Sequence, residues 1–225
     1  MRPGSLEEFI RLLPEGIGVI PTFLNIREGT VSEFKTVMDA VESKIQELSG
    51  LGVDLIHPEG APPFMVQGYE AERALVQGWE KKYGVPIITA PQTQTNAMRV
   101  LDIHRFVGVT YFTGEINDIC AKYFTDAGYN VLAMEGIDVP FAEVGRLSSF
   151  EVYAHTKRAF LKHRNVDGIY MLGSGWRTLD IIETLEQDLE VPVVHPVPAR
   201  VWAVQRRLHV RQPVVGYGRL LEELH

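Results

Sequence analysis

Short apolar segments alternate with stretches of helical periodicity along most of the chain. The apolar segments are rich in β-branched side chains, which favours buried parallel strands over fragments of helices. The segments that we predict to be strands are Ile17–Pro21, Val53–His57, Pro86–Thr89, Phe106–Phe112, Asn130–Met134, Gly168–Leu172 and Pro192–His195.

Between these segments, apolar side chains recur every three or four residues, which is the spacing of one helix face. The first such pattern ends at Gly50 and consists of Phe34, Val37, Met38, Val41, Ile45 and Leu48. The same spacing predicts helices over Tyr69–Tyr83, Thr95–His104, Glu115–Ala127, Ser149–His163, Thr178–Leu189 and Ala199–Leu208. Alternation of strands and helices predicts right-handed βαβ units, and therefore an α/β fold with a parallel sheet covered on both faces.

Two segments of similar pattern indicate an internal duplication. VDLIHPEGAP (Val53–Pro62) and VDGIYMLGSG (Val166–Gly175) both run from Val-Asp through an apolar strand into a glycine-containing turn before a helix. Two similar α/β halves facing each other would bring both turns to one shared cleft. A chance similarity of two buried strands is the alternative.

Composition and charge narrow the range of partners. The chain has 225 residues, of which 45% are hydrophobic, and its 22 basic and 29 acidic residues give a net charge of −7 without a basic block. This balance argues against nucleic acid or an anionic membrane as the main partner. The sequence offers no apolar run of spanning length and no signal peptide at its start, so a cytoplasmic protein is expected. The single cysteine, Cys120, excludes an intramolecular disulfide and a cysteine-based zinc cluster.

Candidate functional residues lie beyond the carboxyl ends of the predicted strands, where ligands of parallel sheets bind. They are Thr22, Asn25, His57, Glu59, Gly60, Tyr111, Thr113, Glu135, Gly173, Ser174, Arg177 and His195. Backbone N–H groups at Gly60–Ala61 and Gly173–Ser174 precede helices and could hold an anion. The GSGWRT turn lacks the third glycine of a dinucleotide site, and no phosphate-loop motif is present. A small carboxylate and no cofactor are therefore expected.

Two histidines and two carboxylates among these positions allow a further interpretation. His57, Glu59, Glu135 and His195 could together bind a divalent metal ion. No spacing of the H-x-x-x-H type supports such a site. A general acid or base with a shifted pKa is the other chemical role for these side chains, and a hydrogen-bonded structural histidine is the simplest.

Four motifs in a fixed order resemble one known superfamily. They are TYFTGEIND (Thr110–Asp118), EGIDVPFAEVGRLSSFEVY (Glu135–Tyr153), LGSGWRTLDIIETLEQDLEVPVV (Leu172–Val194) and HPVPARVW (His195–Trp202). They resemble the aspartate/glutamate racemase superfamily, and within it the maleate isomerase and arylmalonate decarboxylase branch. This resemblance implies two pseudo-symmetric parallel-sheet α/β halves with the active site in the cleft between them. We assign residues 1–105 and 196–225 to the first half and 106–195 to the second.

The resemblance also implies catalytic thiols that this sequence lacks. Racemases and maleate isomerases of this type use one cysteine from each half, and arylmalonate decarboxylases keep the second. The corresponding positions here are Gly60 and Gly173. The family's turn tyrosine aligns with Phe112, beside Tyr111, and Asn25 is a displaced equivalent of an early turn asparagine. Family members are often oligomeric, so a homo-oligomer is expected.

Three functions are compatible with this pattern. The first is a thiol-independent enzyme, decarboxylase- or lyase-like, that acts on a small carboxylic or dicarboxylic acid through an enolate-like intermediate. Its substrate would be held by the two backbone turns with Thr113, Ser174, Asn25 and Arg177, and its proton group would be one of Tyr111, His57, Glu59 and His195. The second is a hydrolase or lyase that uses the metal site described above. The third is a carboxylate-binding protein without catalysis.

Overall fold

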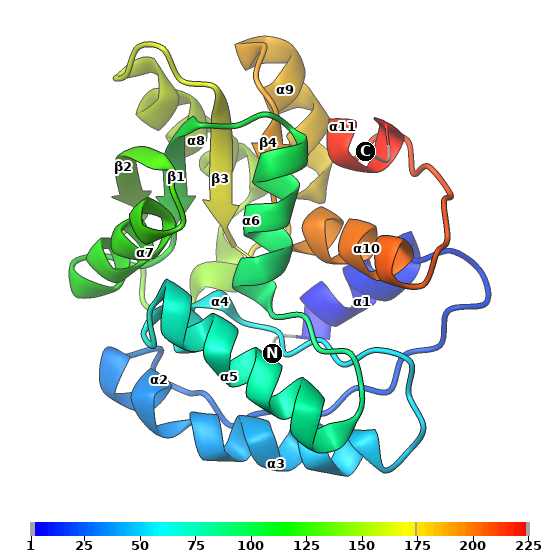
Figure 1. The fold of residues 1–225 in the computed structure, drawn as a ribbon. Helices are drawn as coiled ribbons and strands as arrows, with labels where there is room; N and C mark the ends of the chain where they lie inside the picture. Colours follow the sequence, from blue (N-terminus) through cyan, green and yellow to red (C-terminus); the bar gives the residue numbers. More distant parts are fainter. Residues whose placement is uncertain (1–2, 174, 224–225) are drawn as a thin grey trace.

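The computed structural model describes residues 3–173 and 175–223, which form an α/β fold around a parallel sheet (Figure 1). The sheet has the order β2-β1-β3-β4, and its strands are β1 (Arg105–Thr110), β2 (Asn130–Gly136), β3 (Gly168–Leu172) and β4 (Val193–Val194). All three strand pairs are parallel. Strands β1 and β3 are almost entirely buried, as expected for strands covered on both faces. The predicted fold class is confirmed.

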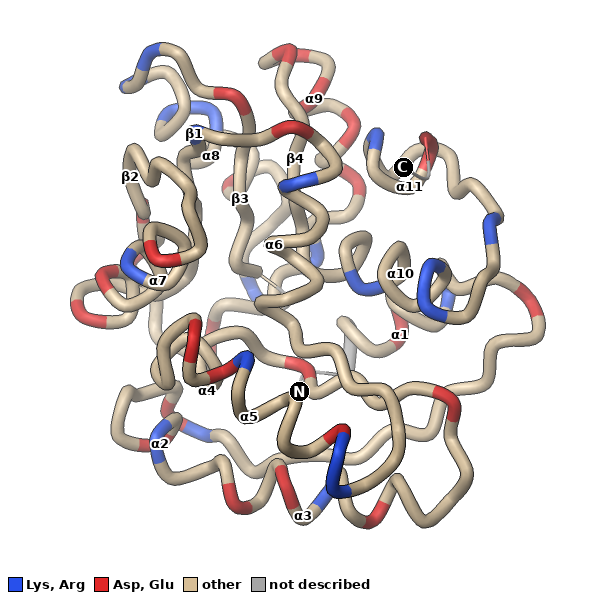
Figure 2. The backbone as a smooth tube through the Cα atoms, in the orientation of Figure 1, with Lys and Arg blue, Asp and Glu red and all other residues tan. Residues whose placement is uncertain are grey.

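Helices surround this sheet and continue into the part of the chain that precedes it. They are α1 (Pro3–Leu12), α2 (Val31–Thr36), α3 (Met38–Ser49), α4 (Ala61–Met65), α5 (Tyr69–Tyr83), α6 (Ala90–Val100), α7 (Glu115–Asp126), α8 (Ser149–Leu161), α9 (Ile182–Leu189), α10 (Pro196–Arg207) and α11 (Arg219–Glu223), with short 3-10 turns η1 (Val144–Arg146) and η2 (Leu179–Ile181). Helices α3, α5 and α7 each carry both basic and acidic positions (Figure 2). Among the described helices, none is long and apolar enough to cross a membrane.

The first half contains much less sheet than the second. Its predicted strands Val53–His57 and Pro86–Thr89 meet in a single parallel bridge between Ile56 and Ile87. Two backbone hydrogen bonds hold this bridge, from the Ile56 N–H to the Pro86 carbonyl (2.9 Å) and from the Ile88 N–H to the Ile56 carbonyl (3.1 Å). A separate apolar cluster from α3, α4, α5 and the bridged segments covers it. The two halves are therefore unequal in sheet content.

The predicted strand Ile17–Pro21 is wrong. The chain is extended there but belongs to no strand. Its side chains alternate between half-buried (Ile17, Val19) and exposed (Ile20), which explains the strand-like pattern. Instead of a neighbouring strand, a cavity lies beside this segment, and residues 17–22 form part of its wall.

Helix starts follow local capping chemistry that the apolar spacing did not show. Helix α6 begins at Ala90, five residues before the predicted start, because Thr89 and Gln92 form a capping box. Helix α10 begins at Pro196, where the His195 side chain accepts a hydrogen bond from the Val197 N–H. Proline is favoured in this first position because its missing N–H would have no partner there.

The end of the chain returns to the first half. Helix α10 packs on α6 and α1, so residues after β4 complete the part of the molecule that precedes β1 (Figure 1). Glu186 in α9 binds the following segments, because its carboxylate accepts hydrogen bonds from the Val193 N–H (2.8 Å) and the Arg219 N–H (2.9 Å). The predicted boundaries of the halves, 1–105 with 196–225 and 106–195, stay a prediction.

Candidate active site

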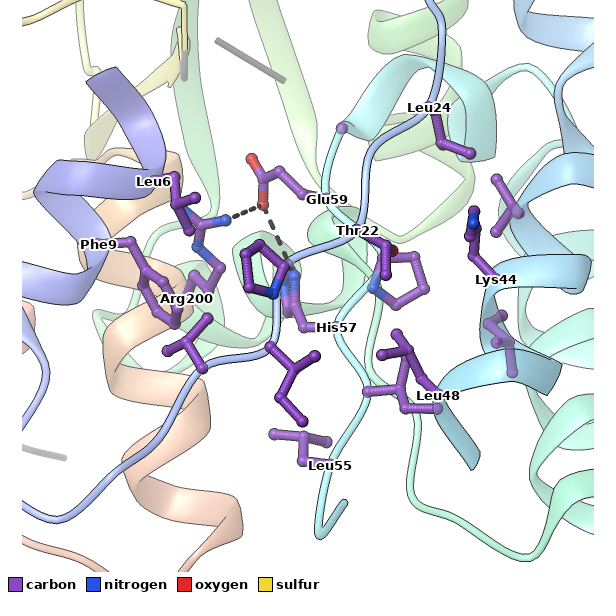
Figure 3. A pocket seen from close by; sticks show the side chains of 18 of the residues that line it. Leu6, Phe9, Thr22, Leu24, Lys44, Leu48, Leu55, His57, Glu59 and Arg200 are labelled. Carbon is purple, nitrogen blue, oxygen red and sulfur yellow. Dashed lines mark ion pairs between the residues drawn. The ribbon is translucent and has the colours of Figure 1, made fainter. Parts of the chain in front are cut away.

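A cavity of about 790 Å³ lies between the first half and the carboxyl end of β1. Its walls are mainly apolar and come from α1, α3, α10, the extended segment 17–27 and residues 51–60. Figure 3 shows Leu6 and Phe9 on one side and Leu24, Lys44 and Leu48 on the other. Its polar lining includes His57, Glu59, Tyr111 and Arg200. The size suits a small organic ligand, for which pockets of about 300–1,000 Å³ are usual.

Glu59 and Arg200 form a buried ion pair inside this cavity. Glu59 Oε2 lies 3.1 Å from Arg200 Nη1, and the two side chains are 10% and 3% exposed. Arg200 is fixed by two more contacts: its guanidinium carbon lies 4.1 Å from the centroid of the Phe9 ring, and Nη2 donates a hydrogen bond to the Ser5 carbonyl (3.3 Å). A buried charge is expensive unless it is paired, so each of the two side chains depends on the other.

His57 lies on the other side of the same carboxylate, with Nδ1 3.6 Å from Glu59 Oε2 (Figure 3). Burial lowers the pKa of His57 to about 4; Glu59 opposes this change and the positive charge of Arg200 adds to it. The imidazole is therefore neutral at pH 7. Neither ring nitrogen has a hydrogen-bond partner among the described residues. A neutral imidazole offers one donor and one acceptor, and no described residue uses either of them.

Tyr111 follows β1 and is held by aromatic neighbours. Its ring centroid lies 4.7 Å from that of Phe112, 5.3 Å from that of Trp176 and 6.1 Å from that of Phe141. Gly175 lies against it, because a Cβ at that position would be 3.3 Å from the Tyr111 hydroxyl. Both residues line the cavity. Tyr111 therefore lines the cavity together with His57 and Glu59, and its ring is held in place by its aromatic neighbours.

Gly60 and Gly173, which we predicted to correspond to the family's cysteine positions, differ in how they would accommodate a side chain. Gly60 lines the cavity, and a Cβ there would meet only Pro63 at 4.0 Å, but its φ of +100° is unsuited to a residue with a side chain. Gly173 has no positive φ, but a Cβ there would lie 2.3 Å from Cε3 of Trp176. Ser174 lies outside the described residues.

The first turn offers fewer backbone donors than the sequence indicated. Helix α4 begins with Ala61, Pro62 and Pro63, and proline has no N–H. Only the N–H groups of Gly60 and Ala61 are left in this turn to hold an anion. Ala61 is itself buried and does not line the cavity, so its contribution depends on the backbone alone.

Several other predicted residues lie elsewhere. His195 is buried at the start of α10, where Nδ1 accepts from the Val197 N–H and Nε2 lies 3.2 Å from Thr178 Oγ1. Thr113 and Asn25 are exposed, and Asn25 accepts a hydrogen bond from Arg27. Arg177 faces a second hollow on the surface. None of these four side chains lines the cavity.

The predicted metal site is corrected by these positions. Glu135 lies on β2, where it pairs with Lys162 at 3.0 Å, and His195 is enclosed in a different part of the second half. Only His57 and Glu59 are close together. Within residues 3–173 and 175–223, no group of three or more histidine, cysteine, aspartate or glutamate side chains could hold a metal ion.

Arg200 lines the cavity but was not among the functional residues predicted from the sequence. It lies in HPVPARVW, which was singled out for its resemblance to a family motif and not for its charge. The signal was an arginine surrounded by apolar residues within a predicted helix. Such an arginine is seldom fully buried without a partner, and its partner Glu59 is far away in the sequence.

His195 is expected to make stability depend on pH. Burial, and then the charge of Arg200, lower the pKa of His195 from 6.5 to about 3. The unfolded chain therefore binds a proton that the folded protein does not, so stability is complete above pH 6.5 and is lost as the pH falls towards 3. The unmodified protein should lose unfolding free energy between pH 7.5 and 5.0. His195→Asn keeps a polar cap, and we expect this variant to lose about 2 kcal/mol less over the same range.

Urea denaturation at the two pH values measures this difference. His209→Asn is the matched control, because His209 is exposed. His57 and the buried carboxyls also make stability depend on pH. Their contributions are the same in each variant and in the unmodified protein, so they cancel in the comparison. The same pH dependence in His195→Asn and the unmodified protein would show that His195 is protonated in the folded state.

Comparison with known proteins confirms the arylmalonate decarboxylase resemblance of the sequence motifs. The model of the arylmalonate decarboxylase family matches residues 7–221, and the chain belongs to this family. An arylmalonate decarboxylase from Bordetella bronchiseptica is 26% identical over 219 residues, which cover 95% of this chain and 89% of the relative.

Solved structures show the same fold. The maleate isomerase Iso from Pseudomonas putida S16 superposes with a TM-score of 0.90 at 19% identity, over 98% of this chain and 94% of that one. A maleate cis-trans isomerase from Nocardia farcinica bound to TRIS gives a TM-score of 0.87 at 18% identity, over 98% and 91%. Unliganded arylmalonate decarboxylase gives 0.79 at 24% identity, over 84% and 83%.

Proposed function

We propose that the protein is a thiol-independent lyase that decarboxylates a small dicarboxylic acid with an apolar substituent, through an enolate-like intermediate. The observation that carries this proposal is a mainly apolar cavity, in a member of the arylmalonate decarboxylase family, with acid–base side chains from both halves inside it. The names of the relatives add decarboxylation and isomerisation of small acids as the reactions to test.

The cavity divides the substrate between apolar and polar surroundings. Its apolar substituent packs against Leu48, Leu55 and the extended segment, and its retained carboxylate accepts a hydrogen bond from the N–H group of Gly60, which lines the cavity. Arg200 is already neutralised by Glu59, so it gives the site its shape and fixes Glu59 instead of binding the substrate. Donors that are fixed before the reaction stabilise charge that develops in the transition state.

The reaction then needs one bond cleavage and one proton. The bond between the α-carbon and the leaving carboxylate breaks, carbon dioxide departs, and the electron pair spreads from the α-carbon into the retained carboxylate. Tyr111 donates its phenolic proton to the α-carbon and regains a proton from solvent. His57, which is neutral, orients the retained carboxylate or a water molecule through its unbonded ring nitrogens. A positioned proton donor of this kind typically contributes about 10²–10⁴-fold to the rate.

A binding protein without turnover is the second candidate, and one observation favours it. The turn that aligns with the remaining thiol of decarboxylases has its side-chain space filled by Trp176. Glycine cannot exchange protons, so catalysis there would have to come from other groups. In a pure binding protein the ligand would raise the melting temperature without being consumed.

Proton NMR in deuterated water distinguishes these possibilities. The purified protein is incubated with alkyl- and arylmalonates, maleate, aspartate, glutamate and a hydantoin. We expect a malonate to yield the monoacid with one deuterium at the α-carbon, and Tyr111→Phe to lower kcat at least about 100-fold. Tyr83→Phe is the matched control, because Tyr83 is half-buried at the end of α5, does not line the cavity and donates a hydrogen bond to Glu42.

Three results would contradict the lyase proposal. Exchange of the α-proton without loss of carbon dioxide would indicate a racemase- or isomerase-like reaction. Saturable thermal stabilisation without turnover would indicate the binding protein. Decarboxylation that is unchanged in Tyr111→Phe would remove Tyr111 from the mechanism.

A further inference from the structure

A second hollow, separate from the candidate active site, lies between α1, the turn before η2 and the segment before α11. Its volume is about 500 Å³, and we call it the charged hollow; its lining is Glu8, Arg11, Arg177, Leu179, Asp180, Val215, Gly216 and Tyr217. It shares no lining residue with the large cavity. Three parts of the chain that are distant in sequence therefore contribute to one small site.

Two positive and two negative side chains meet here without pairing. Glu8 and Arg11 come from α1, and Arg177 and Asp180 from the turn around η2. Arg11, Arg177 and Asp180 are all close enough to Glu8 to influence its pKa, which burial raises. Nevertheless, among the residues that the structure describes, none of the four forms an ion pair within 4.0 Å; Asp180 only accepts a hydrogen bond from Ser149.

One oxygen of Glu8 strengthens this observation. Oε2 is buried from solvent and has no hydrogen-bond partner within the described part of the chain. A buried carboxylate oxygen without a donor is costly, and such atoms commonly mark a site where a ligand or water binds. The hollow therefore presents an unsatisfied acceptor beside two guanidinium groups that pair with no carboxylate among the described residues.

We propose that the charged hollow binds a small zwitterion of the α-amino acid type, with its carboxylate on Arg11 and Arg177 and its ammonium group on Glu8 and Asp180. A simple anion would have to approach two carboxylates, and a simple cation would have to approach two guanidinium groups. A zwitterion satisfies both pairs at once, and the arginines offer forked donors that match a carboxylate. Leu179, Val215 and Tyr217 supply an apolar surface for its side chain.

This site is joined to the candidate active site by one short turn. Trp176 packs against Tyr111 and Gly173, and the next residue, Arg177, lines the charged hollow. A ligand that fixes Arg177 therefore acts on the turn that forms one wall of the large cavity through Gly175. The binding proposal itself does not depend on the proposed decarboxylation.

Calorimetric titration of the 225-residue protein with glycine, leucine, phenylalanine and glutamate tests the proposal. We expect saturable binding of at least one of these amino acids. N-acetylation or conversion to the methyl ester should weaken that binding at least about tenfold, because each removes one charge. Arg177→Gln and Glu8→Gln should have effects of the same size. Arg164→Gln is the matched control, because Arg164 is exposed and outside both cavities.

Four results would overturn the assignment. Binding of the N-acetyl derivative as tightly as the free amino acid would indicate an anion site. Binding that Arg177→Gln leaves unchanged would exclude the charged hollow. Loss of binding in Tyr111→Phe but not in Arg177→Gln would place the amino acid in the large cavity. Absence of binding by all four amino acids up to their solubility would reject a zwitterion site.

Discussion

Replacement of Arg200 by methionine should lower the free energy of unfolding by about 3–5 kcal/mol, because it leaves the carboxylate of Glu59 buried without its counter-ion. For a chain of this length the melting temperature should fall by about 6 °C or more. Methionine keeps much of the volume of the side chain, so the loss reports mainly the broken ion pair. Thermal and urea denaturation at pH 7 measure both quantities.

Two variants show whether the buried pair is responsible. Arg207 lies on the same helix as Arg200 and pairs with Glu80 of α5 at 3.5 Å. Arg207→Met removes this pair, which is largely exposed and should contribute less than about 1 kcal/mol. Glu59→Gln combined with Arg200→Met should recover part of the lost stability, because the unpaired charge is gone. If Arg200→Met costs no more than Arg207→Met, the buried pair does not stabilise the fold.

Gly173→Cys, which places a thiol at the position predicted from the sequence motifs to correspond to the family's second cysteine, should be strongly destabilising. The new Cβ would lie 2.3 Å from Cε3 of Trp176, so the indole ring must move from a position where it is 1% exposed. Overpacking of this kind costs about 1–3 kcal/mol and sometimes more. Trp176→Leu alone should also cost about 3 kcal/mol, because it leaves a cavity. The double variant combines both substitutions. It should lose at least about 1 kcal/mol less unfolding free energy than the two single variants lose together.

Gly78→Cys is the matched control for the introduced thiol. Gly78 lies in α5, and a Cβ there meets no atom within 4 Å. Strict additivity of Gly173→Cys and Trp176→Leu would show that Trp176 does not occupy the space of the missing side chain.

The periodicity of apolar residues predicted the helices and strands that bury a whole face in the core. Tyr69–Tyr83 is helix α5 with the predicted bounds, and Gly168–Leu172 is β3. Ile17–Pro21 failed because a cavity wall has the same alternation of apolar and exposed positions as a strand. The start of α6 was misplaced because the capping box at Thr89 and Gln92 depends on two polar side chains, which a search for apolar spacing ignores.

The candidate site, like the fold, was predicted from the sequence only in part. His57, Glu59, Gly60 and Tyr111 follow strand ends, and all four line the cavity. Their roles stay predictions, as does a homo-oligomeric state. Arg200 could not be found by this rule because it comes from the middle of a helix. Its partner Glu59 is close to it only after the end of the chain has returned to the first half.

That return has a consequence for the order in which a newly made chain can fold. A ribosome completes Glu59 and the bridged segments of the first half well before it makes α10. Until then, the surfaces of α1 and α6 that receive α10 are uncovered, and the carboxylate of Glu59 has no guanidinium beside it. The sheet β2-β1-β3-β4 is also complete before α10 begins. The second half can therefore form during synthesis, whereas the large cavity closes only when residues 196–207 have left the ribosome.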